Sequence, residues 1–487
     1  MTLRALARGS FLITVANLVP RAGAFLLLPI YARFLTRADF GTVSLAGSAA
    51  LLLAITYRLG LDAALLRMHH DVGQADRRHL YATLAAVSLA AAAGVTVLAA
   101  LLVPVLVAAD LLPIVVLALA IGALNAIQFV PSVWYRATDQ VGRYLALALI
   151  AFGVVAAVTV LLVVVVRAGA VGSLLGQLAG AAVMAGAALA ILWRQRPWRV
   201  RGDLARRGLS FGLPLLPHSM AGWILNVSDR ALLGLLLGLA AADALAAIGV
   251  YSLGYQLGYA VGLAAISFNA AWLPFLYRVG GGPAGPAVLR EAATLAIAGF
   301  IGLAAAVAIL ASDLIRVIAP PEWAGAGNVT AVVAFASAFN AAGLMLASGM
   351  YLARRTRLMP ILTIGAAAAN VGLNLLLIPR IGIMGAAWAT LGAYAVLAAL
   401  IGIAARRHYP LALDGPRLAL VAGVAVGLTL VSRAVDPGEQ GLSAAWHLGV
   451  AIVAMIAIAL ILRGSFAQLR ARLADTPPGS GFGQAVG

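Results

Sequence analysis

The sequence contains no cysteine and no lysine, and all 33 of its basic residues are arginine. Without cysteine the chain has no disulfide, no iron–sulfur cluster and no thiol nucleophile. Without lysine it has no Walker A loop, because the lysine of that loop reaches the nucleotide phosphates, and no Schiff-base chemistry. ATP binding and hydrolysis by the P-loop route are therefore excluded.

Charged residues are also scarce, at 10% of the 487 residues, whereas a soluble domain carries about 25%. Hydrophobic residues make up 63% of the chain and the mean hydropathy is +1.03. A membrane helix needs about 20 residues, so fourteen such helices would use about 280. The composition can supply that many, and it predicts a polytopic membrane protein.

Hydrophobic runs separated by charged or Pro/Gly-rich breaks predict an all-α integral membrane protein with about fourteen transmembrane helices. The first run contains Arg21 and has no small-residue cleavage site after it, which favours a retained helix over a signal peptide. The predicted spans are 11–33, 41–66, 80–109, 111–135, 144–166, 169–193, 211–238, 246–276, 291–312, 328–352, 359–379, 383–405, 418–435 and 442–462.

The arginines predict the orientation of these spans. With the N-terminus in the cytoplasm, 24 arginines fall on the cytoplasmic side, six on the opposite side and three inside spans. Because basic residues favour the cytoplasmic side, we expect both termini to be cytoplasmic. The net charge of +17 therefore indicates no nucleic-acid partner. The densest basic run, at 194–207, is interpreted mainly as a positive-inside anchor and alternatively as a contact with anionic lipid headgroups.

A weak internal repeat predicts two six-helix lobes related by a two-fold axis along the membrane normal. Residues 167–172 (RAGAVG) match 380–385 (RIGIMG), and 40–45 (FGTVSL) resemble 248–253 (IGVYSL) at an offset of 208. An offset that spans an even number of helices keeps both copies in one orientation. The predicted divisions are an N-terminal lobe at 1–208, a C-terminal lobe at 209–405, helices 13 and 14 at 406–463, and a disordered cytoplasmic tail at 464–487.

Five charged residues fall near the bilayer centre in the predicted spans, where each costs about 2.5–3.5 kcal/mol. Arg21, Arg58 and Arg230 are candidates to hold an anionic group in a central cavity, since guanidinium groups suit phosphate geometry. Asp62 and Asp229 are polar or coupling candidates. The alternative is that these residues form buried ion pairs, Arg58 with Asp62 and Asp229 with Arg21 or Arg230.

Other polar and aromatic residues in the same spans are further candidates to line the cavity. Asn17 and Gln256 could contact a polar solute. Tyr251, Tyr255 and Tyr259 recur every four residues, so they form one stripe, which could stack on sugar rings or could simply pack against neighbouring helices. The histidines are scattered and no paired acid and base is evident, so we predict no metal site, no catalytic residue and no cofactor.

Four segments carry a family resemblance. They are 28–41 (LPIYARFLTRADFG), 212–214 (GLP) together with 228–230 (SDR), 249–252 (GVYS), and 374–389 (NLLLIPRIGIMGAAWA). These segments, in this order, resemble the polysaccharide-transporter family, which includes the O-antigen-type lipid-linked oligosaccharide flippases. That family lies within the multidrug/oligosaccharidyl-lipid/polysaccharide exporter superfamily.

The resemblance implies a flippase that moves a polyprenyl-pyrophosphate-linked oligosaccharide or polysaccharide repeat unit from the cytoplasmic to the outer leaflet by alternating access. It implies a multi-pass protein of the bacterial inner membrane that serves cell-surface polysaccharide biosynthesis. The implied partners are the lipid-linked glycan, membrane lipids and other polysaccharide assembly proteins. In relatives cationic cavity residues are thought to hold the pyrophosphate, and Arg21 and Arg58 occupy comparable places.

Two other functions remain open at this point. A multidrug/cation antiporter of the related branch would need unpaired membrane carboxylates. A membrane-bound polysaccharide polymerase or glycosyltransferase usually needs a large outer loop or an acidic catalytic pair, and neither is evident. The sequence therefore favours a transporter over an enzyme.

Overall fold

The computed structural model describes residues 23, 25–106, 111–280, 284–407, 409, 411–435 and 440–474. Within these residues the protein is almost entirely helical and contains no β-strand. The chain forms two compact units, Met1–Gly249 and Val250–Gly487, and each is described by itself. The boundaries predicted for the two lobes and for helices 13 and 14 remain predictions.

The prediction of a polytopic all-α membrane protein is confirmed. Twelve helices in the described part of the chain are long and apolar enough to cross a membrane, and a shorter apolar helix covers Phe25–Phe34. Twelve of the fourteen predicted spans correspond to these helices. The predicted first span lies mostly outside the described residues, and the seventh, 211–238, coincides with a helix at Leu216–Leu236.

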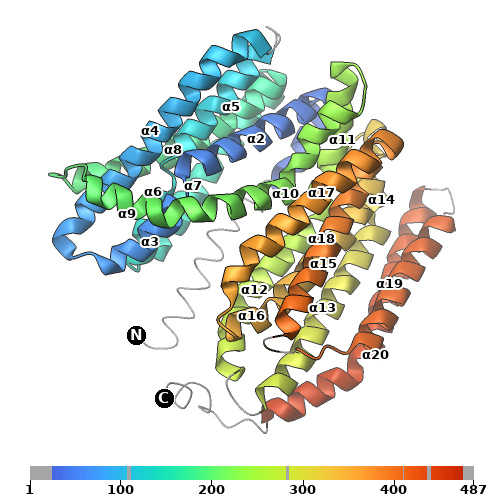
Figure 1. Cartoon of the computed structure of the whole chain (residues 1–487). Helices are drawn as coiled ribbons and strands as arrows, with labels where there is room; N and C mark the ends of the chain where they lie inside the picture. Colours follow the sequence, from blue (N-terminus) through green and yellow to red (C-terminus); the bar gives the residue numbers. More distant parts are fainter. Residues whose placement is uncertain are drawn as a thin grey trace. The chain divides into compact units, whose positions relative to one another are not determined.

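The first unit contains α2 to α10 and the beginning of α11 (Figure 1). Its helices are α2 (Arg37–Arg58), α3 (Leu61–Asp71), α4 (Gln74–Leu106), α5 (Leu112–Asn125), α6 (Phe129–Ala137), α7 (Val141–Thr159) with the π-helical turn η2 (Val160–Val165), α8 (Gly169–Arg194), α9 (Gly202–Gly212), the 3₁₀ turn η3 (Leu213–Leu215), α10 (Leu216–Leu236) and α11 (Ala241–Gly258).

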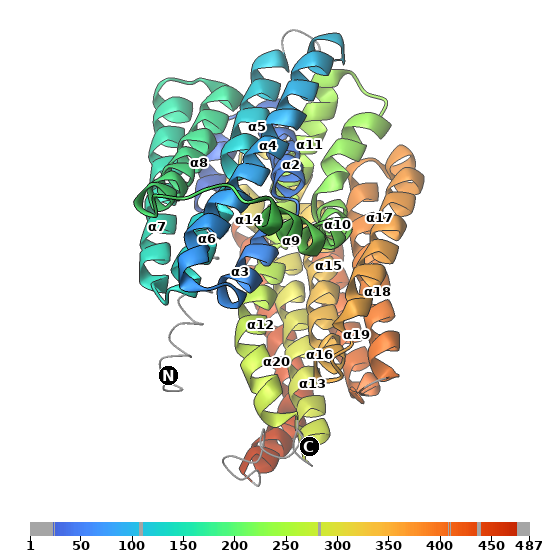
Figure 2. The same ribbon diagram turned by 60° about the vertical axis from the view of Figure 1, so that its left-hand side comes forward.

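The second unit is built around α13, α15, α17 and α18, which pack side by side (Figure 2). Its helices after α11 are α12 (Ala260–Val279), α13 (Gly285–Ile309), α14 (Ala311–Ile318), η4 (Pro321–Trp323), α15 (Ala326–Leu346), α16 (Ser348–Leu352), η5 (Thr356–Leu358), α17 (Met359–Ile381), α18 (Ile383–Arg406), α19 (Gly415–Ala434) and α20 (Gln440–Ala474).

The last helix, α20, is longer than the sequence predicted. It continues to Ala474, twelve residues beyond the predicted end of span 14 at 462. The extension is held by α19, because the Arg417 guanidinium donates to the buried hydroxyl of Ser465. Leu469 packs against the apolar clusters of α13 and α19. Residues 464–474 are therefore helical rather than disordered, and 475–487 lie outside the described residues.

The repeated segments form helix junctions that are alike at two glycines and differ at the preceding arginine, since Arg167 has positive φ whereas Arg380 lies inside α17. Gly169 and Gly382 both have positive φ, +55° and +58°, a conformation that glycine adopts without strain. Three residues later Gly172 and Gly385 lie against the preceding helix, so that a Cβ would come within 3.1 Å of the Leu162 carbonyl carbon and 2.5 Å of the Leu377 carbonyl carbon respectively. The matching glycines support the duplication, while the two-fold relation of the lobes remains a prediction.

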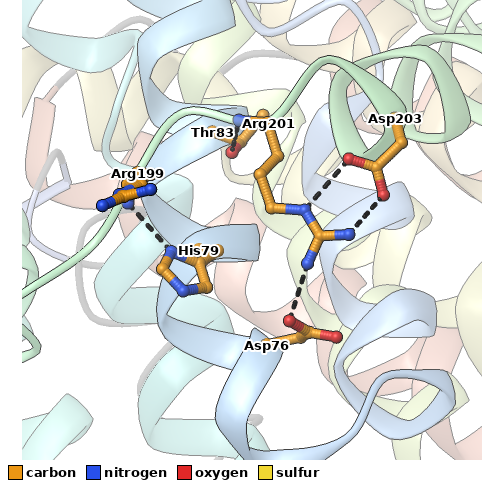
Figure 3. A network of polar contacts seen from close by, with 6 residues as sticks. All are labelled: Asp76, His79, Thr83, Arg199, Arg201 and Asp203. Atoms are coloured by element: carbon orange, nitrogen blue, oxygen red, sulfur yellow. Dashed lines mark hydrogen bonds and ion pairs between the residues drawn. The ribbon is translucent and has the colours of Figure 1, made fainter.

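A polar network fixes the segment between α8 and α9 on the side of α4 (Figure 3). Arg201 donates to both carboxylate oxygens of Asp203, at 3.0 and 2.7 Å, and to Asp76 of α4 at 2.7 Å. Two backbone N–H groups complete the attachment, that of Arg199 to His79 Nδ1 and that of Arg201 to the Thr83 hydroxyl. The hydrogen bonds from Arg201 lower the pKa of Asp203, and those to Asp203 raise the pKa of Arg201.

This network predicts a pH-dependent effect of removing the Asp203 charge. Because the pKa of Asp203 is lower in the folded protein, its stabilisation is present above about pH 4 and is lost as the pH falls through the folded value. Asp203→Asn should lower the melting temperature at pH 7 by less than about 2 °C, since exposed pairs contribute little. Thermal melts in detergent should show that the difference in melting temperature between wild type and Asp203→Asn, present at pH 7, disappears in acid. An equal difference at both pH values would contradict the assignment of the effect to the Asp203 charge.

Candidate functional site

Two membrane helices of the first unit are interrupted, and Arg58 joins the interruptions. The chain leaves helical geometry between α2 and α3, where Leu59 and Gly60 have positive φ. Between α5 and α6 the regular α-helical hydrogen bonds give way to a turn at 126–128, although Ala126 and Gln128 keep helical φ and ψ. Arg58 donates through Nε and Nη2 to the Asn125 carbonyl, at 3.0 and 2.9 Å, and through Nη2 to Gln128 Oε1 at 3.2 Å. The guanidinium at the end of α2 therefore caps the end of α5, where the Asn125 carbonyl also accepts a backbone hydrogen bond from Gln128 at 3.3 Å.

Ser88 of α4 satisfies two more backbone groups at the same level. Its fully buried hydroxyl lies 3.0 Å from the Tyr57 carbonyl and 2.8 Å from the Ala126 carbonyl, one from each broken helix. Inside a membrane, interrupted helices persist only where other protein groups or water satisfy the freed backbone. Arg58 and Ser88 supply those groups, so both breaks are built into the fold.

A third interruption, between α9 and α10, lies against the first. Pro214 and Pro217 occupy the beginning of η3 and of α10, positions where the missing N–H of proline is tolerated. A Cβ on Gly60 would lie 2.3 Å from the Gly212 carbonyl oxygen, and one on Gly212 would lie 2.4 Å from the Leu59 carbonyl oxygen. The backbones of α3 and α9 can approach this closely only because both residues are glycine.

Arg58 does not lie at the same level as Asp229 and Arg230. α2 runs antiparallel to the stretch from α9 to α11, because Gly60 approaches Gly212 and the Trp223 indole donates to the Ser48 carbonyl at 2.9 Å. At 1.5 Å per residue, Arg58 lies about 15 Å from the Ser48 level in one direction, and Arg230 lies about 10 Å from it in the other. The structure therefore separates two of the three candidate arginines by about 25 Å along the helix axes.

Asp229 and Arg230 are both buried in the first unit, Asp229 completely. Arg230 donates through Nη1 to the carbonyl of Asn226, one turn earlier in α10, at 2.8 Å. Asp62, in contrast, is exposed on the first turn of α3 and forms no ion pair with Arg58 within 4.0 Å. The alternative pairing of Arg58 with Asp62 is therefore not found in this conformation.

The remaining candidates divide into two groups. Asn17 and Arg21 lie outside the described residues. The rings of Tyr251 and Tyr255 in α11 lie 5.8 Å apart, and the ring of Tyr259, the residue between α11 and α12, stacks on that of Tyr255 at 6.0 Å. Tyr251 and Tyr255 are buried, whereas Tyr259 and its neighbour Gln256 are half-buried. The stripe is continuous, as the spacing predicted, and in this conformation its first two rings serve packing.

A reciprocal contact joins α2 and α11 inside the first unit. A Cβ on Gly41 would lie 1.9 Å from the Leu245 carbonyl oxygen, and a Cβ on Gly249 would lie 2.0 Å from the Arg37 carbonyl oxygen. Each glycine faces the carbonyl four residues before the other, so the two helices cross at equivalent points. Gly41 and Gly249 are also matched residues of the internal repeat. The two copies of this motif therefore contact each other directly.

No group of three or more His, Asp or Glu residues that could hold a metal ion occurs within the described residues. The sequence indicated Arg58 as a site residue and Gly212 as part of a family segment, but sequence reasoning missed Ser88 and Gly60, which complete the interrupted region. An isolated serine in an apolar span is the one signal that pointed to Ser88. The contact between two glycines 152 positions apart leaves no signal in a single sequence.

The interrupted apolar helices and their arginine cap define a membrane transporter fold, and comparisons with known proteins agree. Residues 6–279 match the family described as "Polysaccharide biosynthesis protein", so the chain belongs to that family. The resemblance predicted from the four sequence segments is confirmed. A search of curated protein sequences gave no significant match.

Solved transporter structures share the fold across most of the chain. An inward closed conformation of the lipid II flippase MurJ matches with a TM-score of 0.72 at 12% identity, covering 94% of this chain and 99% of that one. An outward-facing multidrug resistance MATE family transporter of the MOP superfamily matches with a TM-score of 0.52 at 13% identity, covering 83% and 94%. The Vibrio cholerae MATE transporter VcmN matches with a TM-score of 0.51 at 14% identity, covering 84% and 98%.

Proposed function

We propose that this protein is a flippase that moves a polyprenyl-pyrophosphate-linked glycan from the cytoplasmic to the outer leaflet by alternating access. The observation that carries the proposal is membership of the polysaccharide biosynthesis family together with a MurJ-like fold along nearly the whole chain. On this proposal both termini are cytoplasmic, the protein resides in the bacterial inner membrane, and it catalyses no covalent chemistry.

The interrupted helices support a conformational cycle. Discontinuous helices at membrane depth are typical of transporters, where the freed backbone groups lie beside the transported solute. Here α2 and α5 are broken at one level and are joined by Arg58 and Ser88. Because Arg58 uses Nε and Nη2 for these bonds, its Nη1 is the donor group that we assign to a pyrophosphate oxygen. Arg21 and Arg230 are the other proposed anion contacts, and Arg230 would meet the anion at a different depth from Arg58.

A cation antiporter is the second candidate, supported by the MATE-like fold and by the exposed carboxylate of Asp62. Three arginines against two aspartates in the predicted spans favour an anion instead. The two functions predict opposite preferences for the charge of the solute, and one assay can compare them.

The test is transport by the purified protein in proteoliposomes. A fluorescent polyprenyl-pyrophosphate-linked oligosaccharide should become accessible to a membrane-impermeant quencher, and a neutral polyprenol-linked analogue with the same sugar should move at least about tenfold more slowly, because it lacks charge-assisted hydrogen bonds to arginine. Cationic dyes should not be exchanged for protons or Na⁺. Dye exchange without glycan movement would reject the flippase in favour of the antiporter.

A further inference from the structure

The first unit carries exposed arginines along the connection between α8 and α9 and on both helices that it joins. Arg194, Arg196 and Arg199 lie on or just after the end of α8, and Arg206 and Arg207 lie on α9. All five side chains are exposed. These five arginines are called the basic surface below.

The carboxylates next to the basic surface are already paired. Asp76 and Asp203 both bind Arg201, at 2.7 Å each, and Arg201 is not one of the five. Within the described residues, the guanidinium groups of the basic surface form no ion pair with any carboxylate. Arg201 therefore holds both carboxylates of the network in Figure 3 but neutralises only one of their two charges, so the network carries −1 against the +5 of the five arginines, a net +4 that attracts an external anion.

Tryptophan side chains place this surface at the edge of the membrane. The Arg196 guanidinium lies 3.6 Å from the centre of the Trp193 ring and 5.9 Å from that of Trp198. Trp193 is 65% exposed at the end of α8, which is a membrane-spanning candidate. Tryptophan favours the headgroup level, where its ring is partly apolar and its N–H is polar. The arginines that follow it therefore lie at the depth of lipid phosphates.

α9 turns its charged side away from the protein. Leu204, Gly208 and Gly212, spaced four residues apart, are buried, and Leu204 packs in the apolar cluster formed by α3 and α4. Arg206 and Arg207 occupy the exposed side. An amphipathic helix of this kind, with arginine on its polar face, lies along a membrane surface and binds anionic lipids.

We propose that the basic surface binds the phosphate headgroups of anionic membrane lipids and holds α9 at the membrane surface. Charge complementarity selects the occupant: five arginines without carboxylate partners face the leaflet that carries anionic lipid, if this end of α8 is cytoplasmic. α9 ends at Gly212, which contacts Gly60 at the interrupted helices. A lipid that holds α9 therefore also restrains Gly212, the end of α9 that packs against Gly60 between α2 and α3.

The test measures lipid retention by the full-length protein in mixed micelles of phosphatidylglycerol and phosphatidylcholine, using native mass spectrometry. The wild type should retain phosphatidylglycerol preferentially. The triple variant Arg199→Gln/Arg206→Gln/Arg207→Gln should bind it at least about tenfold more weakly, since each arginine near a membrane surface contributes to the attraction. Raising the salt from about 0.1 M to 1 M should weaken retention, because the screening length falls from about 10 Å to 3 Å.

The matched control removes the same charge elsewhere. Arg354→Gln/Arg355→Gln/Arg357→Gln alters three exposed arginines of the second unit and should keep the wild-type preference. Circular dichroism and melting curves verify that both triple variants are folded. Equal retention by the two triple variants would overturn the proposal. Displacement of the lipid by millimolar inorganic phosphate would also overturn it, because the surface would then bind the free anion and not the membrane.

Discussion

Arg58→Ala is expected to reduce glycan transport to background while the protein still inserts into the membrane. The substitution removes three hydrogen bonds, two to the Asn125 carbonyl and one to Gln128. A buried polar group left without its partner costs about 1–3 kcal/mol, so the melting temperature should also fall. Loss of a charge-assisted contact to pyrophosphate would reduce transport by about tenfold or more even well below the melting temperature.

Two further variants separate the structural role of Arg58 from substrate binding. Gln128→Ala removes one of the three bonds and leaves the guanidinium, so it should lower stability slightly and keep most transport. Arg58→Lys keeps the charge but not the planar group that reaches Asn125 and Gln128 together. It should therefore retain only part of the transport activity and part of the stability of the wild type.

The control for Arg58 is Arg143→Ala, which removes an exposed arginine whose hydrogen bond is to Gln140 in the same region of the chain. Transport and melting should match the wild type. The measurements are glycan flipping in proteoliposomes and thermal unfolding in detergent. Normal transport by Arg58→Ala would remove Arg58 from the proposed anion site and leave it as a helix cap.

Gly41→Ala and Gly249→Ala are each expected to slow transport at least about tenfold. A Cβ at either position would lie about 2 Å from a carbonyl oxygen of the facing helix, so α2 and α11 would have to move apart. Overpacking of this kind costs about 1–3 kcal/mol, which would disfavour the conformation in which the helices cross closely. If this crossing forms and breaks in each transport cycle, the alanine variants rarely reach the conformation in which the two helices cross closely, and transport slows.

Gly47→Ala and Gly234→Ala are the matched controls for the crossing. Gly47 lies in α2 and Gly234 in α10, and a Cβ would meet its nearest neighbour at ordinary distances of 3.9 and 3.6 Å. Alanine also favours helix over glycine by up to about 1 kcal/mol, so these variants should be as stable as the wild type or more stable. If all four variants transport equally, the close approach has no role in the cycle.

The sequence by itself determined the class of protein. Because every backbone group inside a bilayer must be satisfied within its own helix or by neighbouring protein, long apolar runs can only be helices. The 10% charged residues and the spacing of the runs predicted fourteen helices, and twelve of them correspond to membrane-spanning candidates in the described part of the chain. Four short segments were enough to indicate the family. The match of Gly41 with Gly249 also came from the sequence, although the contact between them did not.

Only the tertiary structure decided what the charged and polar residues do. Arg58 and Asp62, one turn apart in the sequence, were expected to share a helix face, but the positive φ values at Leu59 and Gly60 end α2 between them. Arg58 consequently reaches Asn125, 67 residues away, and Asp62 is exposed on α3. Hydropathy measures how favourably a segment transfers from water to lipid, and this depends on the residues of that segment alone. Helix breaks, their caps and the approach of Gly60 to Gly212 depend on which segments pack together, and that choice is made by the whole fold.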